Sequence, residues 1–309
     1  MDALSRVLEL AQIRGSLDLR CLFAGGFAVD HPPMPTGEAP FHLMLQGAAV
    51  VELPDGSSQR LAAGELLLLP RGNAHLVRDV SRASPIHPMK LSGEGIVPIR
   101  RNTDRGAEVD LLCGRFVYAP GAADLIMRSL PDVLHLSLEG DDVLEGLRGI
   151  VSLLRREVEE PRPGGLELAT ALTRALFVLV LRGYGLGDGV RISLLALLGD
   201  LRLSRAVTAM LQDPGKDWTL SLLAEQAAMS RATFARQFAR KSDKSPMELL
   251  TVLRMQLAGE WLRQGQLAIG DVAERVGYQS ESAFGKAFFQ YMGATPAHFR
   301  RAHGQLAEK

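Results

Sequence analysis

Few side chains of this chain have the type and spacing for covalent chemistry, and its two cysteines come first. Cys21 and Cys113 lie in two separate strand-like apolar stretches of the N-terminal half. A free cysteine in such a stretch is most often a small, buried apolar side chain. A thiolate beside basic groups such as Arg20 and Arg115 would instead oxidise readily. The cysteines are therefore either inert core residues or oxidisable thiols, which could stop at sulfenic acid or form a disulfide within or between subunits.

No other set of residues has the spacing of a catalytic centre. The sequence contains no Gly-rich phosphate loop, no paired cysteines of a zinc site, and no Ser/His/Asp set within a supporting local motif. We therefore expect the chain not to be an enzyme.

A second group of candidate side chains lies where the sequence repeats itself. Two phenylalanines four residues apart and a later proline occur twice, 50 residues apart, and these residues are Phe234, Phe238, Pro246, Phe284, Phe288 and Pro296. Phenylalanines at i and i+4 share one helical face and can anchor that helix against a partner. Each copy predicts a short helix, a tight turn and a second helix, which is the layout of a helix-turn-helix that enters the DNA major groove.

The face opposite the phenylalanines would be free to contact DNA. The residues predicted to lie there are Arg231, Ala232, Ala235, Arg236, Arg240, Glu281, Ser282 and Lys286. We expect Arg236 to read a base edge, with Arg231 and Arg240 nearer the phosphates. Glu281 either accepts a hydrogen bond from cytosine or only favours the helix dipole.

Local signals fix the ends of the helices around these copies. Ser230 and Ser280 are expected N-caps of the two second helices. A capping box at Ser245 to Glu248 predicts a helix that runs to about Gln264 and stops at Gly265. Such a helix is about 27 Å long, so it could hold two recognition helices about one DNA turn, or about 34 Å, apart.

These motifs also resemble a known family. Gly277–Phe284, Ala287-Phe288 and Gly293–Pro296 are similar to the signature of AraC-type transcription regulators, and Trp218–Leu220, Met229–Arg231 and Arg254-Met255 agree with it. The resemblance covers about the last hundred residues, and it implies double-stranded DNA and RNA polymerase as partners. Asp243 stands where the family has a glycine, and we expect it to adopt the left-handed conformation.

The N-terminal half has a different texture, with short β-like runs between Gly and Pro residues. The predicted strands are Leu17–Phe23, Phe41–Leu45, Ala48–Leu53, Leu66–Leu69, Asp110–Tyr118 and Val133–Leu138. Many short strands favour a sandwich or a small barrel. The segment Ser81 to Arg105 is rich in Pro, Gly and charge, and we expect an exposed loop there.

Two stretches of this half resemble cupin barrels. Pro70–His75 is similar to the second cupin motif, and Phe41–Met44 with Gly47 resembles a degraded first motif. Metal-binding cupins present two histidines and a carboxylate from the first motif and one histidine from the second. Here Met44 and Ala48 or Ala49 stand where further ligands are expected, which leaves His42 and His75. The resemblance implies either half of a zinc or iron(II) site, or a hydrogen-bonded histidine pair with no required cofactor.

Helical patterns follow the strands. Leu4–Ile13, Asp141–Glu157 and Gly165–Tyr184 have helical spacing of apolar residues. The last is apolar on most of its surface, so it is buried in a homodimer interface or packs on the barrel. Gly183 to Gly189 predicts a hinge. The expected domains are residues 1–190, a sensor and dimerisation domain, and residues 200–309, the DNA-binding domain.

Charge and targeting signals fit this division. Residues 201–309 hold 15 Lys/Arg and 10 Asp/Glu, whereas residues 1–200 hold 20 and 25. A mildly basic C-terminal part suits phosphate contact. The start of the chain has no signal-peptide pattern and no run is long enough to span a bilayer, so we expect a cytoplasmic protein that does not enter membranes.

A further resemblance concerns the signal. Met1–Arg6, Cys21, His42, Asn73–His75 and Cys113-Gly114 are similar to a subgroup of cupin-bearing AraC regulators that sense reactive chlorine or other oxidants through cysteine. The stretch from His75 to Cys113 is longer here, so the pairing of the two thiols stays open. The sequence thus predicts an α+β, homodimeric DNA-binding activator that senses an oxidant. The alternatives are a regulator gated by a small molecule or metal, and a cupin metalloenzyme, which needs three or more ligands.

Overall fold

The computed structural model describes residues 2–85, 87–93, 95–103, 106–118, 122–137, 142–160, 162–186 and 194–304. The chain forms two compact units: residues 1–12, 119–129 and 188–309, and residues 13–118 and 130–187. The described strands all lie in the second, sheet-rich unit, and the first is helical, which confirms the α+β class. No described helix has the length and apolar character needed to cross a membrane. The expected boundary at residues 190–200 separates most of the two units, but residues 1–12 and 119–129 belong with the helical one.

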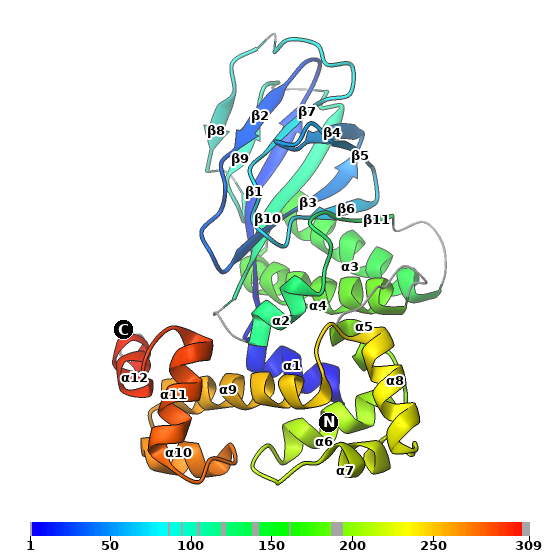
Figure 1. Ribbon diagram of the computed structural model, residues 1–309. Coiled ribbons are helices and arrows are strands. Elements are labelled where there is room, and N and C mark those ends of the chain that lie inside the picture. Colours follow the sequence, from blue (N-terminus) through cyan, green and yellow to red (C-terminus); the bar gives the residue numbers. More distant parts are fainter. Residues whose placement is uncertain are drawn as a thin grey trace. The chain divides into compact units, whose positions relative to one another are not determined.

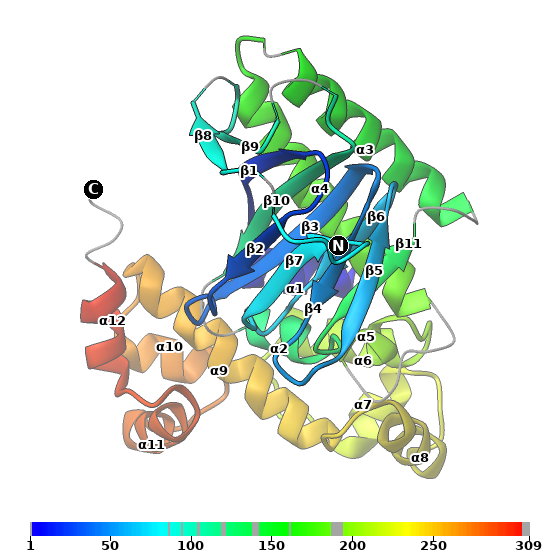
Figure 2. The same cartoon turned by 90° about the horizontal axis from the view of Figure 1, so that it is seen from above.

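The sheet-rich unit contains two sheets (Figure 2). The seven-stranded sheet has the order β11-β6-β3-β10-β1-β9-β8, and the four-stranded sheet has the order β2-β7-β4-β5. The strands are β1 Arg14–Phe23, β2 Ala28–His31, β3 Glu38–Gln46, β4 Ala48–Glu52, β5 Ser58–Ala62, β6 Glu65–Leu68, β7 His75–Asp79, β8 Lys90–Ser92, β9 Ile99–Arg101, β10 Val109–Val117 and β11 Leu134–Ser137. All six predicted strands are present.

The core of this unit draws on both sheets. Met44 and Leu111 of the seven-stranded sheet and Val51 and Val77 of the four-stranded sheet belong to one buried apolar cluster. Each buried side chain of this kind contributes about 1.5–3 kcal/mol relative to exposure in water. Because side chains alternate along a strand, one face of each sheet supplies this cluster. The other face of the seven-stranded sheet is free to receive helices.

Two helices of the same unit, α3 (Asp142–Glu159) and α4 (Gly165–Leu186), pack together, and α4 lies against β1. A Cβ atom at Gly15 would lie 2.5 Å from Thr173 Cγ2, so the strand and the helix can approach this closely only at a glycine. The rings of Phe116 and Phe177 add a contact of 4.6 Å between centroids. Packing of the apolar helix on the sheet, one of the two expectations, is therefore observed.

The segment from Ser81 to Arg105 is not simply an exposed loop. It contains β8 and β9, and β9 pairs in parallel with β1, opposing Ile99 to Arg20 and Arg100 to Cys21. The side chain of Ile99 is buried, which gives β9 an apolar contact to the sheet. The prediction of a loop was wrong here because Pro, Gly and charge concealed a strand of three residues.

The helical unit is assembled from separate stretches of the chain (Figure 1). Its helices are α1 Ala3–Ala11, α2 Ala122–Arg128, α5 Leu194–Leu198, α6 Leu203–Gln212, α7 Leu220–Gln226, α8 Arg231–Lys241, α9 Pro246–Gln264, α10 Ile269–Arg275, α11 Glu281–Met292 and α12 Pro296–Gly304. The N-terminal helix α1 packs on α2, α6 and α9. Val7 and Ala11 are buried, and Gln12 Nε2 donates to Glu260 Oε1 over 2.9 Å. The first residues of the chain therefore complete this unit.

The predicted helix ends are largely confirmed. Ser230 and Ser280 cap α8 and α11, and Ser245 forms the capping box with Glu248 at the start of α9. Gly265 ends α9 with φ 71°. The prediction for Asp243 was wrong, because α8 ends on an extended Ser242 and Asp243 has no positive φ. In the expected hinge, residues 183–186 are helical and residues 187–189 lie outside the described part.

A candidate DNA interface and a buried thiol–histidine cluster

The two second helices, α8 and α11, are held by the same device. In α8, Phe234 and Phe238 are fully buried with ring centroids 5.5 Å apart. In α11, Phe284 and Phe288 are fully buried with ring centroids 5.4 Å apart. Each pair fixes one face of its helix to the unit, so the opposite face is left for a partner.

The predicted DNA-facing residues lie on those opposite faces. Seven of the eight are exposed, namely Arg231, Ala232, Arg236, Arg240, Glu281, Ser282 and Lys286, and Ala235 is half-buried. The helix α9 runs between the two motifs (Figure 1). The face of α8 presents three arginines, which are donors for phosphate oxygens and guanine edges.

The sheet-rich unit brings together three histidines, of which the sequence indicated two. His42 on β3 and His75 on β7 lie with their Nε2 atoms 2.7 Å apart. His31 on β2 is the cross-strand partner of His75, and the two rings stack with centroids 4.6 Å apart. One nitrogen from each of these residues, hereafter the histidine cluster, lies within 4.8 Å of the others. His31 was missed because its strand is short and ends at Pro32.

The thiol of Cys113 joins this cluster. His42 Nδ1 lies 3.2 Å from Cys113 Sγ, and His75 Nδ1 lies 2.9 Å from the carbonyl oxygen of Asn73. A carbonyl only accepts, so His75 Nδ1 carries a hydrogen and donates it. His75 Nε2 then accepts from His42 Nε2, which leaves His42 Nδ1 to accept from the Cys113 thiol. We call this sequence of hydrogen bonds, from Cys113 to the Asn73 carbonyl, the thiol–histidine row.

The ionisation of these groups agrees with that row. Burial, with nearby His31 and His75, lowers the pKa of His42 well below its ordinary value. Burial and His75 lower the pKa of His31 to about 4, and burial lowers that of His75. The neighbouring Cys21 side chain and burial raise the pKa of Cys113 well above its ordinary value, against an opposing effect of Arg100. The thiol and the imidazoles are therefore neutral at physiological pH.

The two cysteines lie on neighbouring strands. Along the antiparallel pair β1–β10, Cys21 opposes Leu111 and Cys113 opposes Leu19. The cysteines are thus diagonal neighbours on one sheet face, where Cα atoms are typically about 7–8 Å apart. Both side chains are buried. Neither cysteine forms a disulfide, and Cys21 is near enough to raise the pKa of Cys113.

The basic groups near the thiols are not those suggested by the sequence. Arg20 makes two hydrogen bonds to the carboxylate of Asp110, at 2.6 and 3.0 Å, and a third to the carbonyl of Val158. Neighbours along a strand point to opposite faces, so Arg20 faces away from the core that holds Cys21. Arg115 pairs with two carboxylates, those of Asp18 and Glu38. The cation whose charge lowers the pKa of Cys113 is Arg100 on β9.

The histidine cluster has the donor chemistry of a zinc or iron(II) site. Three neutral imidazoles with a backbone acceptor behind one of them match the usual surroundings of such ions. The 2.7 Å separation of His42 Nε2 and His75 Nε2 is a hydrogen-bond distance, whereas two nitrogens on one zinc ion lie about 3.3 Å apart. Binding an ion would also require a free lone pair on His42 Nε2. His42 would then carry its hydrogen on Nδ1 and donate toward Cys113.

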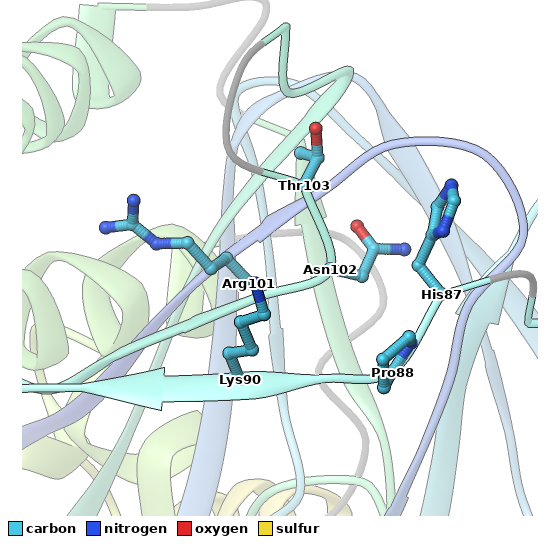
Figure 3. A pocket seen from close by; sticks show the side chains of 6 residues that line it. All are labelled: His87, Pro88, Lys90, Arg101, Asn102 and Thr103. Atoms are coloured by element: carbon cyan, nitrogen blue, oxygen red, sulfur yellow. The ribbon is translucent and has the colours of Figure 1, made fainter.

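A separate surface hollow of about 280 Å³ lies on the segment from Ser81 to Arg105. It is lined by His87, Pro88, Lys90, Arg101, Asn102 and Thr103. The guanidinium of Arg101 extends away from His87 and Asn102 (Figure 3). The lining side chains do not converge on one point, so this hollow has no arrangement comparable to the histidine cluster.

Comparison with known proteins identifies both parts of the chain. Residues 2–185 match the cupin family, and residues 223–302 match a helix-turn-helix domain family. The chain is 32% identical to the RCS-specific HTH-type transcriptional activator RclR of Escherichia coli, over 99% of this chain and 100% of that protein. It is 29% identical to a putative AraC-like transcription regulator of Streptomyces lividans, over 97% and 98%. Crystalline ToxT of Vibrio cholerae matches over 96% and 98% of the chains at 13% identity and a TM-score of 0.38.

A cupin domain joined to two helix-turn-helix motifs defines a transcription regulator that binds DNA, and not an enzyme. The chain belongs to the AraC-like family of such regulators.

The direction of each hydrogen bond in the thiol–histidine row is testable. In chelator-treated protein near pH 7, we expect His42 as the Nε2–H tautomer and His75 as the Nδ1–H tautomer, because only these satisfy both ends of the row. Long-range ¹H–¹⁵N correlation spectra distinguish the two tautomers, and His298, exposed on α12, serves as a reference ring. An Nδ1–H tautomer at His42 would reverse the row and contradict the assignment.

Proposed function

We propose that this regulator reads its operator through α8 and α11 and activates transcription when an oxidant modifies Cys21 and Cys113. The observation that carries the second part is the contact of Cys113 with both Cys21 and His42 in the core. RclR, similar over the whole chain, is named an RCS-specific activator, which supports both the signal and the direction.

Oxidation of the thiols requires no group beyond the oxidant. Hypochlorous acid takes an electron pair from the sulfur of Cys21, which becomes a sulfenic acid while chloride and a proton leave. The Cys113 sulfur then attacks that sulfur, water leaves, and a disulfide forms. Because the thiolate is the nucleophile, the raised pKa of Cys113 slows the attack by its sulfur. Diagonal strand neighbours need a local shift to reach disulfide geometry, so the reaction also changes the sheet.

The disulfide would break the thiol–histidine row at its start. His42 Nδ1 would lose the hydrogen that Cys113 donates, and it would become a buried acceptor without a donor. Such a group costs about 1–3 kcal/mol, which is enough to shift a balance between two conformations by about 5- to 150-fold. The signal thus enters the barrel as a lost hydrogen bond.

A second candidate function is metal binding by the histidine cluster, favoured by the approach of His31, His42 and His75. These residues would hold zinc or iron(II), and a bound ion would fix the rings and orient the His42 hydrogen toward Cys113. His42 would then contact both the metal ion and the thiol of Cys113, so metal binding would affect the chemistry of that thiol.

We further propose a homodimer that contacts RNA polymerase. Leu153 of α3 and Leu166 and Leu168 of α4 are 41%, 51% and 43% exposed. Exposed apolar residues on two helices that pack together support pairing with a second copy.

For DNA reading, Arg236→Ala is expected to lower affinity for a duplex selected by the wild-type protein by about 1–3 kcal/mol and to relax preference at one base position. Arg240→Ala, as the matched variant, should weaken all duplexes alike and reduce the salt dependence by about one counterion. Titrations with selected and random duplexes measure both. Equal weakening on both duplexes by Arg236→Ala would assign Arg236 to the phosphates.

For the thiol switch, Cys21→Ser and Cys113→Ser should bind the selected duplex as the wild type does but lose the response to hypochlorite. Intact mass should reveal a disulfide in the wild type and a sulfenic acid in Cys113→Ser, because Cys113 can no longer resolve it. DNA binding and transcription are measured before and after oxidation. A double variant that still responds would reject the switch and direct attention to the barrel.

For metal, protein purified without an affinity tag and dialysed against zinc should retain about one ion per chain. His31→Ala and His75→Ala should lose it, whereas His298→Ala, at an exposed position, should not. Elemental analysis gives the stoichiometry directly. Wild-type protein that retains no zinc would exclude the site.

A further inference from the structure

The helix α11 carries a large apolar side chain in water. Phe289 is 55% exposed, while Phe284 and Phe288 of the same helix are fully buried. A single exposed apolar residue is ordinary on a protein surface. Its position on the helix therefore decides whether Phe289 has a role.

Phe289 lies on the face predicted to contact DNA. It follows Ser282 by seven residues and Lys286 by three, and residues at these spacings form one row along a helix. Ser282 and Lys286 are exposed. The anchors Phe284 and Phe288 occupy the opposite side. Phe289 thus extends the row of residues assigned to DNA toward the C-terminal half of α11.

The motif does not need an aromatic ring at this position for its own stability. The repeat places Ala239 of α8 at the site equivalent to Phe289, and Ala239 is also exposed. One turn before Phe289, an added Cβ atom at Gly285 would meet no atom within 4 Å. The ring therefore stands beside bare backbone, with space for a base edge to approach.

We propose that Phe289 reads a thymine by packing on its C5-methyl group in the major groove that α11 enters. This inference rests on the proposed function, in which α11 faces DNA. The thymine methyl is the apolar group that base pairs present in the major groove, and an apolar side chain recognises it by contact. The face of α8 is rich in arginine, whereas α11 presents one lysine and one glutamate. The second motif thus adds apolar recognition to the hydrogen bonding of the first.

The test uses the full chain and a duplex that it selects from a random library. Each thymine is replaced in turn by deoxyuridine, which lacks the methyl group and keeps the same base pairing. The wild type should lose about fourfold in affinity at one thymine, the value of burying one methyl-sized group. That thymine should lie in the half of the site not affected by Arg236→Ala.

Variants assign the loss to the ring. Phe289→Ala should bind the thymine and uracil duplexes equally, and Phe289→Leu should keep the preference because it remains apolar. Tyr291→Ala, which removes another exposed aromatic side chain of α11, should also keep it. Fluorescence anisotropy measures all four proteins.

Two results would overturn the inference. One is a substitution series with no sensitive thymine outside the Arg236 half, and the other is a preference for thymine that survives Phe289→Ala. A wild-type protein that selects no sequence at all would overturn the proposed DNA reading as well, so the two failures are distinguishable.

Discussion

Polar groups buried among apolar side chains must find partners among themselves, and this requirement governs the interior of the sheet-rich unit. Cys113, His42 and His75 lie on β10, β3 and β7, so the thiol–histidine row joins the seven-stranded sheet to the four-stranded one. His42 and His75 each use one ring nitrogen as donor and the other as acceptor, and the row ends at the Asn73 carbonyl. A change at the thiol therefore alters the hydrogen bonding of a histidine on the four-stranded sheet.

In the helical unit, buried apolar side chains hold the two recognition helices in place. The same pair of phenylalanines holds α8 and α11, and the burial of successive residues along the two helices is almost identical. The outward faces differ in chemistry, with arginines on α8 and a mixture of acidic, basic and aromatic residues on α11. The motif therefore separates the residues that keep it folded from those proposed to read DNA, and the second set is free to vary.

Features that depend on neighbours in sequence were predictable, and those that depend on strand pairing were not. The serine caps, the stop at Gly265 and the paired phenylalanines follow from local geometry. The pairing of β2 with β7 brings His31 to the other two histidines, and the pairing of β9 with β1 brings Arg100 near the thiols. Closeness in sequence can also mislead. Arg20 precedes Cys21 directly, but side chains alternate along the strand, so Arg20 points to the other face and binds Asp110. The sequence therefore indicated both cysteines and two of the three histidines, but neither His31 nor Arg100.

The helical unit includes α1 and α2, which lie far from the DNA-binding motifs in sequence. A fragment cut at residue 200 would lack the apolar surface of Val7 and Ala11 against α6 and α9, and Glu260 would lose its contact with Gln12. The C-terminal part of the chain is therefore not a self-contained folding unit. Recombination that exchanges only the C-terminal halves of paralogues would combine α1 of one protein with α6 and α9 of another. Their packing surfaces would not match, so the two halves are expected to have been inherited together.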